Sequence, residues 1–381
     1  MVIVKRHFRG GLVNANKHKQ TKATGVRLSR ALTLINRSVH RRMINTVGQL
    51  EEQLSLPLEA DVAAVSNLVG DLLILGAGGK MGPSLAKLAR RAIHQSGVRK
   101  RVIAVARFSD PQLRDDLESC GIETVARDLL QPGALAQLPE VENVVFMAAR
   151  KFGTSGCEHL TWAMNSFLPG LVAERFRNSR IVGFSTGNVY GLQPVSQGGA
   201  TESTAAVPVG EYAQSALGRE RMFEYGSHQW GTPVVLLRLN YAVELRYGVL
   251  VDIGLAVFNR QPVNLQMGYV NVIWQGSANS ACLRAFALCQ SPPLLLNITG
   301  PETLSVRQIA EEFGRRFKIE PHFTGKESDV AILSNAQKAI SLFGPPTVPP
   351  SQLIEWIAHW IANGGALLNK PSHFEVQDGK F

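Results

Sequence analysis

Four glycines between an apolar segment and a helical pattern form the most informative feature of this 381-residue sequence. The loop comprises Gly76, Gly78, Gly79 and Gly82, with Lys80 and Met81 between the last two. A strand that enters a helix through such a loop holds the diphosphate of a dinucleotide, because the glycines turn the chain sharply, admit the phosphates and let strand and helix pack closely. The free N–H groups at the helix N-terminus face the same phosphates. Residues 76–82 are therefore predicted to bind a dinucleotide cofactor.

The residues that follow the next apolar segments indicate which dinucleotide is bound. Arg107 ends the segment 102–106, where an acidic residue would bind the ribose of NAD and an arginine instead pairs with the 2′-phosphate of NADP. The predicted cofactor is therefore NADP, with NAD as the alternative. Asp128 and Leu129 follow the segment 122–125, and Asp128 either bonds to the adenine amino group or caps a helix.

Two later segments would supply the groups beside the nicotinamide. Ala148 and Ala149 end an apolar segment that begins at Val144, and their small side chains would let a ribose lie against the backbone. The hydroxyl of Thr186, which follows the segment 181–184, would hydrogen-bond a reacting carbonyl or alcohol. A turn in which this hydroxyl bonds its own backbone is the alternative.

All these residues follow apolar segments that alternate with helical patterns. The apolar segments are 72–75, 102–106, 144–149, 181–184, 234–237 and 294–298, and the helical stretches include 160–176 and 212–225. Continuously apolar strands that alternate with helices indicate a parallel sheet with both faces covered. The predicted fold is an α/β, Rossmann-type doubly wound parallel sheet with a smaller, mainly C-terminal substrate lobe. Ligands in such sheets bind at the carboxyl ends of the strands.

The predicted domain organisation has five parts. Residues 1–42 form a basic tail, 43–70 a helical segment broken at Pro57, and 71–239 the NAD(P)-binding domain. Residues 240–365 form most of the substrate lobe, with the strand 294–298 returning to the sheet, and 366–381 form a C-terminal tail.

Taken in order, the motifs between about residues 70 and 360 resemble the extended short-chain dehydrogenase/reductase family, in its NAD-dependent epimerase/dehydratase group. The matching residues are Gly76-x-x-Gly79-x-x-Gly82, Ala148-Ala149, Asn165, Ser185-Thr186-x-x-Val189-Tyr190-Gly191 and Gly300-Pro-Glu-Thr-Leu-Ser305. The resemblance implies an NAD(P)-dependent oxidoreductase or epimerase/dehydratase-like enzyme that transfers a hydride at a hydroxyl or ketone of a sugar or nucleotide sugar. It makes Tyr212 the acid/base or hydrogen-bond donor and Thr186 the residue that orients the substrate oxygen.

The same resemblance places Asn188, Arg246 and Tyr247 in segments that line the substrate, with plain surface exposure as the alternative for the last two. It also implies a homodimer, since members of the family commonly pair through two helices.

The sequence departs from the family at the lysine that follows the tyrosine by four residues. That lysine grips the nicotinamide ribose, and its charge lowers the pKa of the tyrosine. Here the position is Ala216. Three explanations stay open: another cation replaces the lysine, the tyrosine is a donor alone, or the protein is a non-catalytic NADP-binding regulator or scaffold. The candidate replacement is Lys151, whereas Arg219 is expected to be a surface or substrate contact because a guanidinium relays protons poorly.

The charge of the chain is concentrated in its first residues. The net charge is +10, but residues 1–42 hold eleven Lys and Arg and no Asp or Glu, so the remainder carries a net charge of −1. We therefore expect no nucleic-acid partner. No membrane span is expected either, since no apolar run approaches the ~18 residues that one requires.

The basic tail is interpreted as translated sequence upstream of a start at Met43. A transit peptide, or an arm that binds nucleic acid or membrane, is the alternative. The four cysteines have neither metal nor disulfide spacing, so no metal site is expected and a cytoplasmic location is favoured. An organellar location would follow if the tail is a transit peptide.

Overall fold

The computed structural model describes residues 43–153 and 156–379. Every element discussed below belongs to one compact unit, Ile44–Phe381. The predictions made for the tail 1–42 lie outside the described residues. Within the described part, no helix is both long enough and apolar enough to cross a membrane.

A seven-stranded parallel sheet forms the centre of this unit, in the strand order β12-β7-β5-β4-β1-β2-β3. Its strands are β1 (Leu72–Leu75), β2 (Val102–Ala106), β3 (Glu123–Ala126), β4 (Asn143–Phe146), β5 (Arg180–Thr186), β7 (Val234–Leu239) and β12 (Leu294–Ile298). The strands β1, β2 and β4 are buried along their whole length, as in a sheet that is covered on both faces. The predicted Rossmann-type α/β fold is confirmed.

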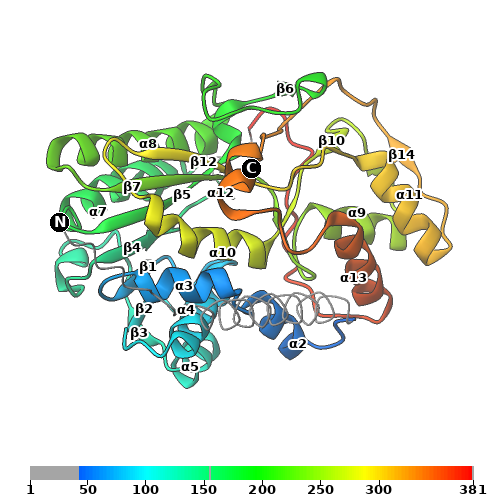
Figure 1. Cartoon of the computed structure of the whole chain (residues 1–381). Helices are drawn as coiled ribbons and strands as arrows, with labels where there is room; N and C mark the ends of the chain where they lie inside the picture. Colours follow the sequence, from blue (N-terminus) through cyan, green and yellow to red (C-terminus); the bar gives the residue numbers. More distant parts are fainter. Residues whose placement is uncertain (1–42, 154–155, 380–381) are drawn as a thin grey trace, which may run out of the picture. The chain divides into compact units, whose positions relative to one another are not determined.

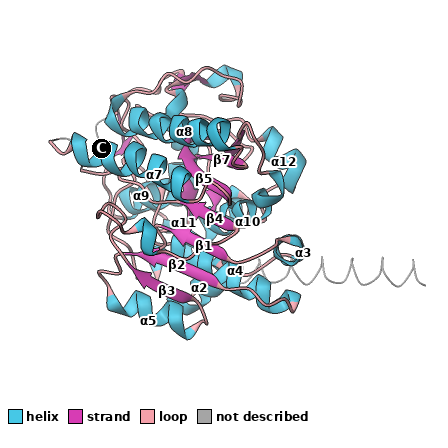
Figure 2. Ribbon diagram, turned by 90° about the vertical axis from the view of Figure 1, so that its left-hand side faces the viewer, coloured by secondary structure: helices cyan, strands magenta, loops and turns pink. Residues whose placement is uncertain are grey.

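Helices cover both faces of this sheet (Figures 1 and 2). They are α3 (Glu59–Asn67), α4 (Gly82–Ser96), α5 (Pro111–Ser119), α7 (Leu168–Arg175), α8 (Gly210–Trp230) and α10 (Gln275–Ala285). On one face, α3, α4, α5 and α10 share a core with Ile74 and Val145. On the other face, α7 and α8 share a core with Leu73 and Phe146. Neighbouring residues of one strand thus enter opposite cores, which is why the strands are continuously apolar.

The helical segment before the sheet is fixed to the cofactor-binding half. Helices α2 (Val47–Leu54) and α3 lie on either side of Pro57, and Thr46 caps α2 by accepting the Gln49 N–H at 3.2 Å. Glu51 of α2 pairs with Lys87 of α4 at 3.3 Å. The first two helices therefore pack beside the helix that follows the glycine loop.

Three helices of the C-terminal half pack on one another: α9 (Val249–Phe258), α11 (Val306–Phe317) and α13 (Pro350–Ala362). They lie together on the right of Figure 1. Four short strand pairs accompany them: β6 (Gln193–Pro194) with β15 (Val330–Ala331), β8 (Ala242–Val243) with β11 (Ile273–Trp274), β9 (Val263–Asn264) with β14 (Phe323–Thr324), and β10 (Tyr269–Val270) with β13 (Leu304–Ser305). Helix α12 (Gln337–Phe343) packs on β12. Ile44–Phe381 is not divided further into compact units. The domain boundaries that the sequence predicts within it, at residues 70, 239 and 365, therefore stay predictions.

The order of strands reverses at β1, which lies between β2 and β4. In open α/β sheets, ligands bind outside the carboxyl ends of the strands at this switch point. The residues singled out from the sequence follow β1, β2, β4 and β5, so the topology brings them to one edge of the sheet.

Candidate active site

The glycine loop leaves β1 in a conformation that only glycine fits. Gly76 has φ +92°, and a Cβ there would lie 2.5 Å from the backbone nitrogen of Ala148. A Cβ at Gly82 would lie 2.3 Å from the carbonyl oxygen of Ala77. The loop therefore runs against the end of β4 and enters α4 at once, with Pro83 in the first turn of the helix. This backbone fits the diphosphate of a dinucleotide.

A buried polar cluster holds α4 behind the loop. The Ser84 hydroxyl donates to the carbonyl of Met81 at 3.0 Å, and the amides of Gln275 and Asn279 in α10 donate to Ser84 Oγ at 3.0 and 2.9 Å. Each of the three side chains is 2% exposed or less. Sequence reasoning missed this cluster, because a polar residue inside a predicted helix carries no sign of what it faces.

The other residues predicted to bind the cofactor lie in different environments. Arg107 is exposed at the end of β2, and its guanidinium forms no hydrogen bond within the described residues. Asp128 accepts the Leu130 N–H at 3.1 Å, while Leu129 is buried in the core. Ala149 is exposed directly after Ala148, which touches the glycine loop.

Thr186 ends β5 and caps the turn that follows. Its Oγ1 accepts the Asn188 N–H at 3.2 Å, as in the turn considered from the sequence. Because the oxygen is used as an acceptor, the hydroxyl proton stays available for a substrate oxygen. Asn188 is 9% exposed, and its side chain makes no hydrogen bond to the described part of the chain.

A buried network fixes this end of β5 against α8. The Ser185 hydroxyl donates to Glu220 at 2.5 Å, and Glu220 accepts two bonds from Arg238 at 2.9 and 2.6 Å. The Arg238 guanidinium lies 4.6 Å from the ring centroid of Tyr190. The network holds Thr186, the neighbour of Ser185, in a fixed position relative to the helix that carries Tyr212.

Tyr212 and Lys151 approach each other from different elements. Tyr212 lies in the first turn of α8 and is 9% exposed. Lys151 follows β4, and its Nζ lies 5.9 Å from the centroid of the Tyr212 ring. Burial lowers the pKa of Lys151 to about 8. The structure therefore brings a lysine to the tyrosine from a neighbouring strand end.

The position of the missing lysine is closed. Ala216 is fully buried and packs in a cluster with Val189, Tyr190 and Ala200. A longer side chain at residue 216 would have to displace members of this buried cluster.

Arg219 is not the surface or substrate contact expected from the sequence. It is 2% exposed, and its guanidinium donates to the carbonyl of Phe184 at 2.7 Å and to Asn165 Oδ1 at 3.0 Å. Burial lowers its pKa. The expectation was wrong because the side chain turns under β5 and stacks near Phe146, at 5.6 Å.

Asn165 joins the loop after β4 to α8. It lies in a π-helical turn, Ala163–Phe167, that separates α6 (Glu158–Trp162) from α7. Its side chain accepts the N–H of Arg150 and donates to the carbonyl of the same residue, both at 2.9 Å, and donates to Ser215 Oγ at 3.0 Å. This clamp fixes the backbone immediately before Lys151. Such π-helical turns occur frequently at functional sites.

Two of the three residues predicted to line the substrate, Arg246 and Tyr247, differ in whether their side chains are already bound. Arg246 donates to Glu244 at 3.0 Å and to Glu51 at 2.8 Å, so its guanidinium is held by two carboxylates. Tyr247 instead turns its ring toward the glycine loop, where Lys80 Nζ lies 3.0 Å from the ring centroid.

The C-terminal segment crosses the same region and was not linked to the site from the sequence. After α13 it forms no regular element, and Figure 1 draws it in red. Ser372 donates through its N–H and its hydroxyl to Asp252 of α9, at 2.8 and 2.5 Å, and its carbonyl accepts from Lys151 Nζ at 3.3 Å. The His373 ring lies 5.7 Å from that of Phe152. No sequence signal marks such a segment, since its contacts are long-range.

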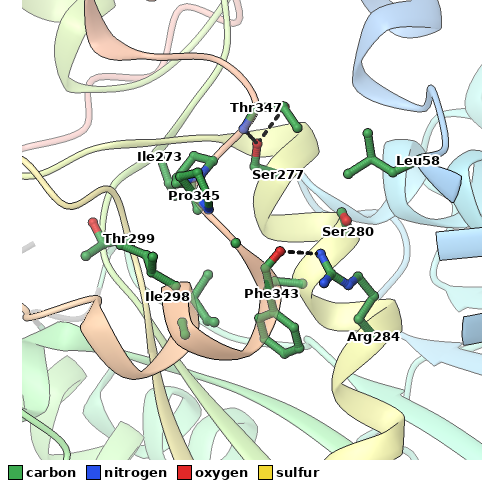
Figure 3. A pocket seen from close by; sticks show the side chains of 15 residues that line it. Leu58, Ile273, Ser277, Ser280, Arg284, Ile298, Thr299, Phe343, Pro345 and Thr347 are labelled. Atoms are coloured by element: carbon green, nitrogen blue, oxygen red, sulfur yellow. Dashed lines mark hydrogen bonds between the residues drawn. The ribbon is translucent and has the colours of Figure 1, made fainter. Parts of the chain in front are cut away.

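A small cavity lies apart from these residues, between α10 and α12 (Figure 3). Its free volume is about 50 Å³, and no residue of the candidate site lines it. Its polar groups are mostly paired: Ser277 with Thr347 at 3.0 Å, and Arg284 with the carbonyl of Phe343 at 2.8 Å.

No protein-family model matches the sequence, and no curated protein does. Solved structures do match. A variant of the UDP-glucuronic acid 4-epimerase from Bacillus cereus, in complex with a fluorinated UDP-sugar and NAD, superposes with a TM-score of 0.65 and 16% identity over 77% of this chain and 99% of that one. The chain has the fold of these epimerases.

Two further structures agree with this one. The UDP-glucose 4-epimerase from Thermotoga maritima matches with a TM-score of 0.64 and 15% identity, over 77% of this chain and 99% of its own. That from Thermus thermophilus, in complex with NAD, matches with a TM-score of 0.62 and 17% identity, over 76% of this chain and 98% of its own. The resemblance predicted from the motifs is therefore confirmed for the fold.

Proposed function

We propose that the protein is an NAD(P)-dependent enzyme of the epimerase/dehydratase type, which transfers a hydride at a hydroxyl or ketone of a nucleotide sugar. The observation that carries the proposal is the approach of Lys151 to the Tyr212 ring, at 5.9 Å. It is supported by the topology, in which the glycine loop, Lys151 and Thr186 follow β1, β4 and β5 at one edge of the sheet. The epimerases that share the fold bind NAD and UDP-sugars, which supports the substrate class.

The residues present fit a dinucleotide, because the glycine turn, in which no Cβ fits at Gly76 or Gly82, leads directly from β1 into the N-terminus of α4. When bound, the nicotinamide supplies or accepts the hydride. Tyr212 exchanges a proton with the substrate oxygen, and Thr186 donates a hydrogen bond to that oxygen. Lys151 takes the place of the lysine missing at residue 216: its ammonium holds the nicotinamide ribose and favours negative charge on the reacting oxygen.

For the cofactor we propose NADP. Arg107 is exposed at the end of β2, where a guanidinium can pair with the 2′-phosphate. Asp128 and Ala149 would contact the adenine and the nicotinamide ribose, and Asn188 and Tyr247 the substrate. Arg246 would also line the substrate, with its guanidinium held in place by Glu244.

We also propose a homodimer in the cytoplasm. Trp162, Phe167 and Tyr225 are 39%, 60% and 59% exposed on α6, the π-helical turn and α8, and a second copy would cover them. All four cysteines are free thiols, as in a reducing compartment.

The test is turnover of NADP(H) and NAD(H) with a panel of nucleotide sugars, comparing the wild type with Tyr212→Phe. We expect turnover to fall by about 10²-fold or more, the usual effect of removing a general acid/base. Tyr269→Phe, in β10 and outside the candidate site, is the matched control. Equal turnover in the wild type and Tyr212→Phe would remove Tyr212 from the mechanism.

A second candidate is a non-catalytic NADP-binding regulator. It is favoured by the closed position of Ala216 and by the peptide carbonyl that accepts from Lys151. This function predicts NADP binding with no hydride exchange on any substrate of the panel.

A further inference from the structure

Lys80 leaves the cofactor loop and points toward the C-terminal half. Its Nζ lies 3.0 Å from the ring centroid of Tyr247, just before α9, and 5.0 Å from that of Phe152. The charged groups that act on it are Lys151, Lys370, Asp252 and Glu244, and the last three belong to the C-terminal half. The ammonium therefore lies among residues of the C-terminal half, although its backbone belongs to the glycine loop.

Within the described residues, Lys80 forms neither a hydrogen bond nor an ion pair, and its contacts are the two aromatic rings. Burial lowers its pKa to about 7. A cation that leaves water without a hydrogen-bonded partner is unfavourable. The fold therefore maintains an ammonium that an incoming anion would stabilise.

Lys151 places a second ammonium at the same ring. Its Nζ lies 5.2 Å from the centroid of Phe152, which Lys80 approaches from the glycine loop. The contacts form a row, Tyr247–Lys80–Phe152–Lys151–Tyr212, that ends at the proposed catalytic tyrosine. Two like charges held at one ring repel each other, so the arrangement favours an anion between them.

We propose that Lys80 and Lys151 form a subsite for a carboxylate on the sugar ring, so that the substrate is a nucleotide sugar acid. This rests on the proposed function, because it assumes that Tyr212 lies at the reacting carbon of the sugar ring. Asp252 acts on both lysines, Lys370 and Glu244 act on Lys80, and Glu375 acts on Lys151. A carboxylate has two oxygens, so it can accept one hydrogen bond from each of the two ammoniums.

Calorimetric titration of the NADP-saturated protein tests the subsite. UDP-glucuronic acid and UDP-glucose make a matched pair, since they differ by a carboxylate in place of a hydroxymethyl group. We expect the wild type to bind the acid at least about tenfold more tightly, the effect of one charge-assisted hydrogen bond. Lys80→Met should remove that preference by weakening the acid alone, and Lys80→Arg should retain it. Lys326→Met, at an exposed lysine, is the control.

Equal weakening of both ligands by Lys80→Met would place Lys80 on the UDP portion or the cofactor and overturn the proposal. Equal affinities of the wild type for the two sugars would overturn it as well. The proposed function fails separately: acid-selective binding without Tyr212-dependent hydride exchange would overturn the chemistry and leave the subsite. Hydride exchange that does not discriminate between the two sugars would overturn the subsite and leave the proposed chemistry. Thermal unfolding of Lys80→Met checks that the variant folds.

Discussion

The glycine loop and the face of α8 that carries Tyr212 meet different physical requirements. The loop needs a particular backbone, since no Cβ fits at Gly76 or Gly82. The proposed chemistry needs positive charge near the tyrosine; Lys151, on another element, lies 5.9 Å from the Tyr212 ring, while Ala216 is packed in a buried cluster. A steric requirement is tied to one position of the sequence, whereas a requirement for charge can be met from any element that reaches the cleft.

Replacing the first glycine tests the steric side of the comparison. Gly76 and Gly97 have φ values of +92° and +71°, but only at Gly76 would a Cβ meet backbone, and at Gly97 nothing lies within 4 Å. Both alanine variants incur about 1–2 kcal/mol of strain. Gly76→Ala should lose a further 1–3 kcal/mol, roughly the usual cost of overpacking, together with NADP binding. Urea unfolding and NADPH fluorescence measure the two effects; equal unfolding midpoints would show that the loop can yield.

Restoring the family's lysine tests the charge side. Ala216→Lys would force an ammonium into the cluster of Val189, Tyr190 and Ala200. We expect a destabilisation of about 3 kcal/mol and no gain in turnover. Gln214→Lys, at an exposed position of the same helix, should leave the unfolding midpoint unchanged. Increased turnover in Ala216→Lys would contradict the proposal that Lys151 replaces the lysine that is absent at residue 216.

The sequence predicted what depends on local rules. The strands of the sheet are continuously apolar, and the glycines stand where backbone contacts require them, so the fold and the loop could be predicted. The direction in which Arg219 points could not, because burial under β5 depends on the packed structure. The same holds for Lys80 facing Tyr247 and for Ser372 reaching Lys151, which are separated by 167 and 221 residues along the chain respectively.

Neutralising Lys151 separates chemistry from binding. We expect Lys151→Met to lower kcat by about 10²-fold, while the Kd of NADP rises only a few-fold, because the variant loses the contact to the ribose and keeps the glycine loop. Lys151→Arg should recover part of the rate, since it restores the charge without the same geometry. Steady-state kinetics and NADPH titration make the measurement. If Lys151→Met does not lower kcat, Lys151 is not the cation that assists Tyr212.

The pH dependence of binding sharpens the role of Lys80. Burial lowers the pKa of Lys80 to about 7 and that of Lys151 to about 8. The charged groups that act on Lys80 are Lys151, Lys370, Asp252 and Glu244, and those that act on Lys151 are Asp252 and Glu375. Both ammoniums are charged below pH 7 and lose their protons as the pH rises. We therefore expect the affinity for UDP-glucuronic acid to fall by about tenfold between pH 6 and 9, and that for UDP-glucose to stay level. Lys80→Arg should reduce the slope, because a guanidinium stays charged.

Ser372→Ala has the smallest expected effect. It tests whether the C-terminal segment positions the ammonium of Lys151. It removes the hydroxyl bond to Asp252 and leaves the backbone bond and the carbonyl that accepts from Lys151. A single hydrogen bond contributes about 1 kcal/mol, so KM should change a few-fold and kcat little. Ser341→Ala, at an exposed serine, is the control. If kcat instead falls as far as in Lys151→Met, the lysine depends on a segment from the far end of the chain. The position of the Lys151 charge near Tyr212 would then be as strictly determined as the backbone of the glycine loop. The difference would be that long-range contacts determine the first and local contacts the second.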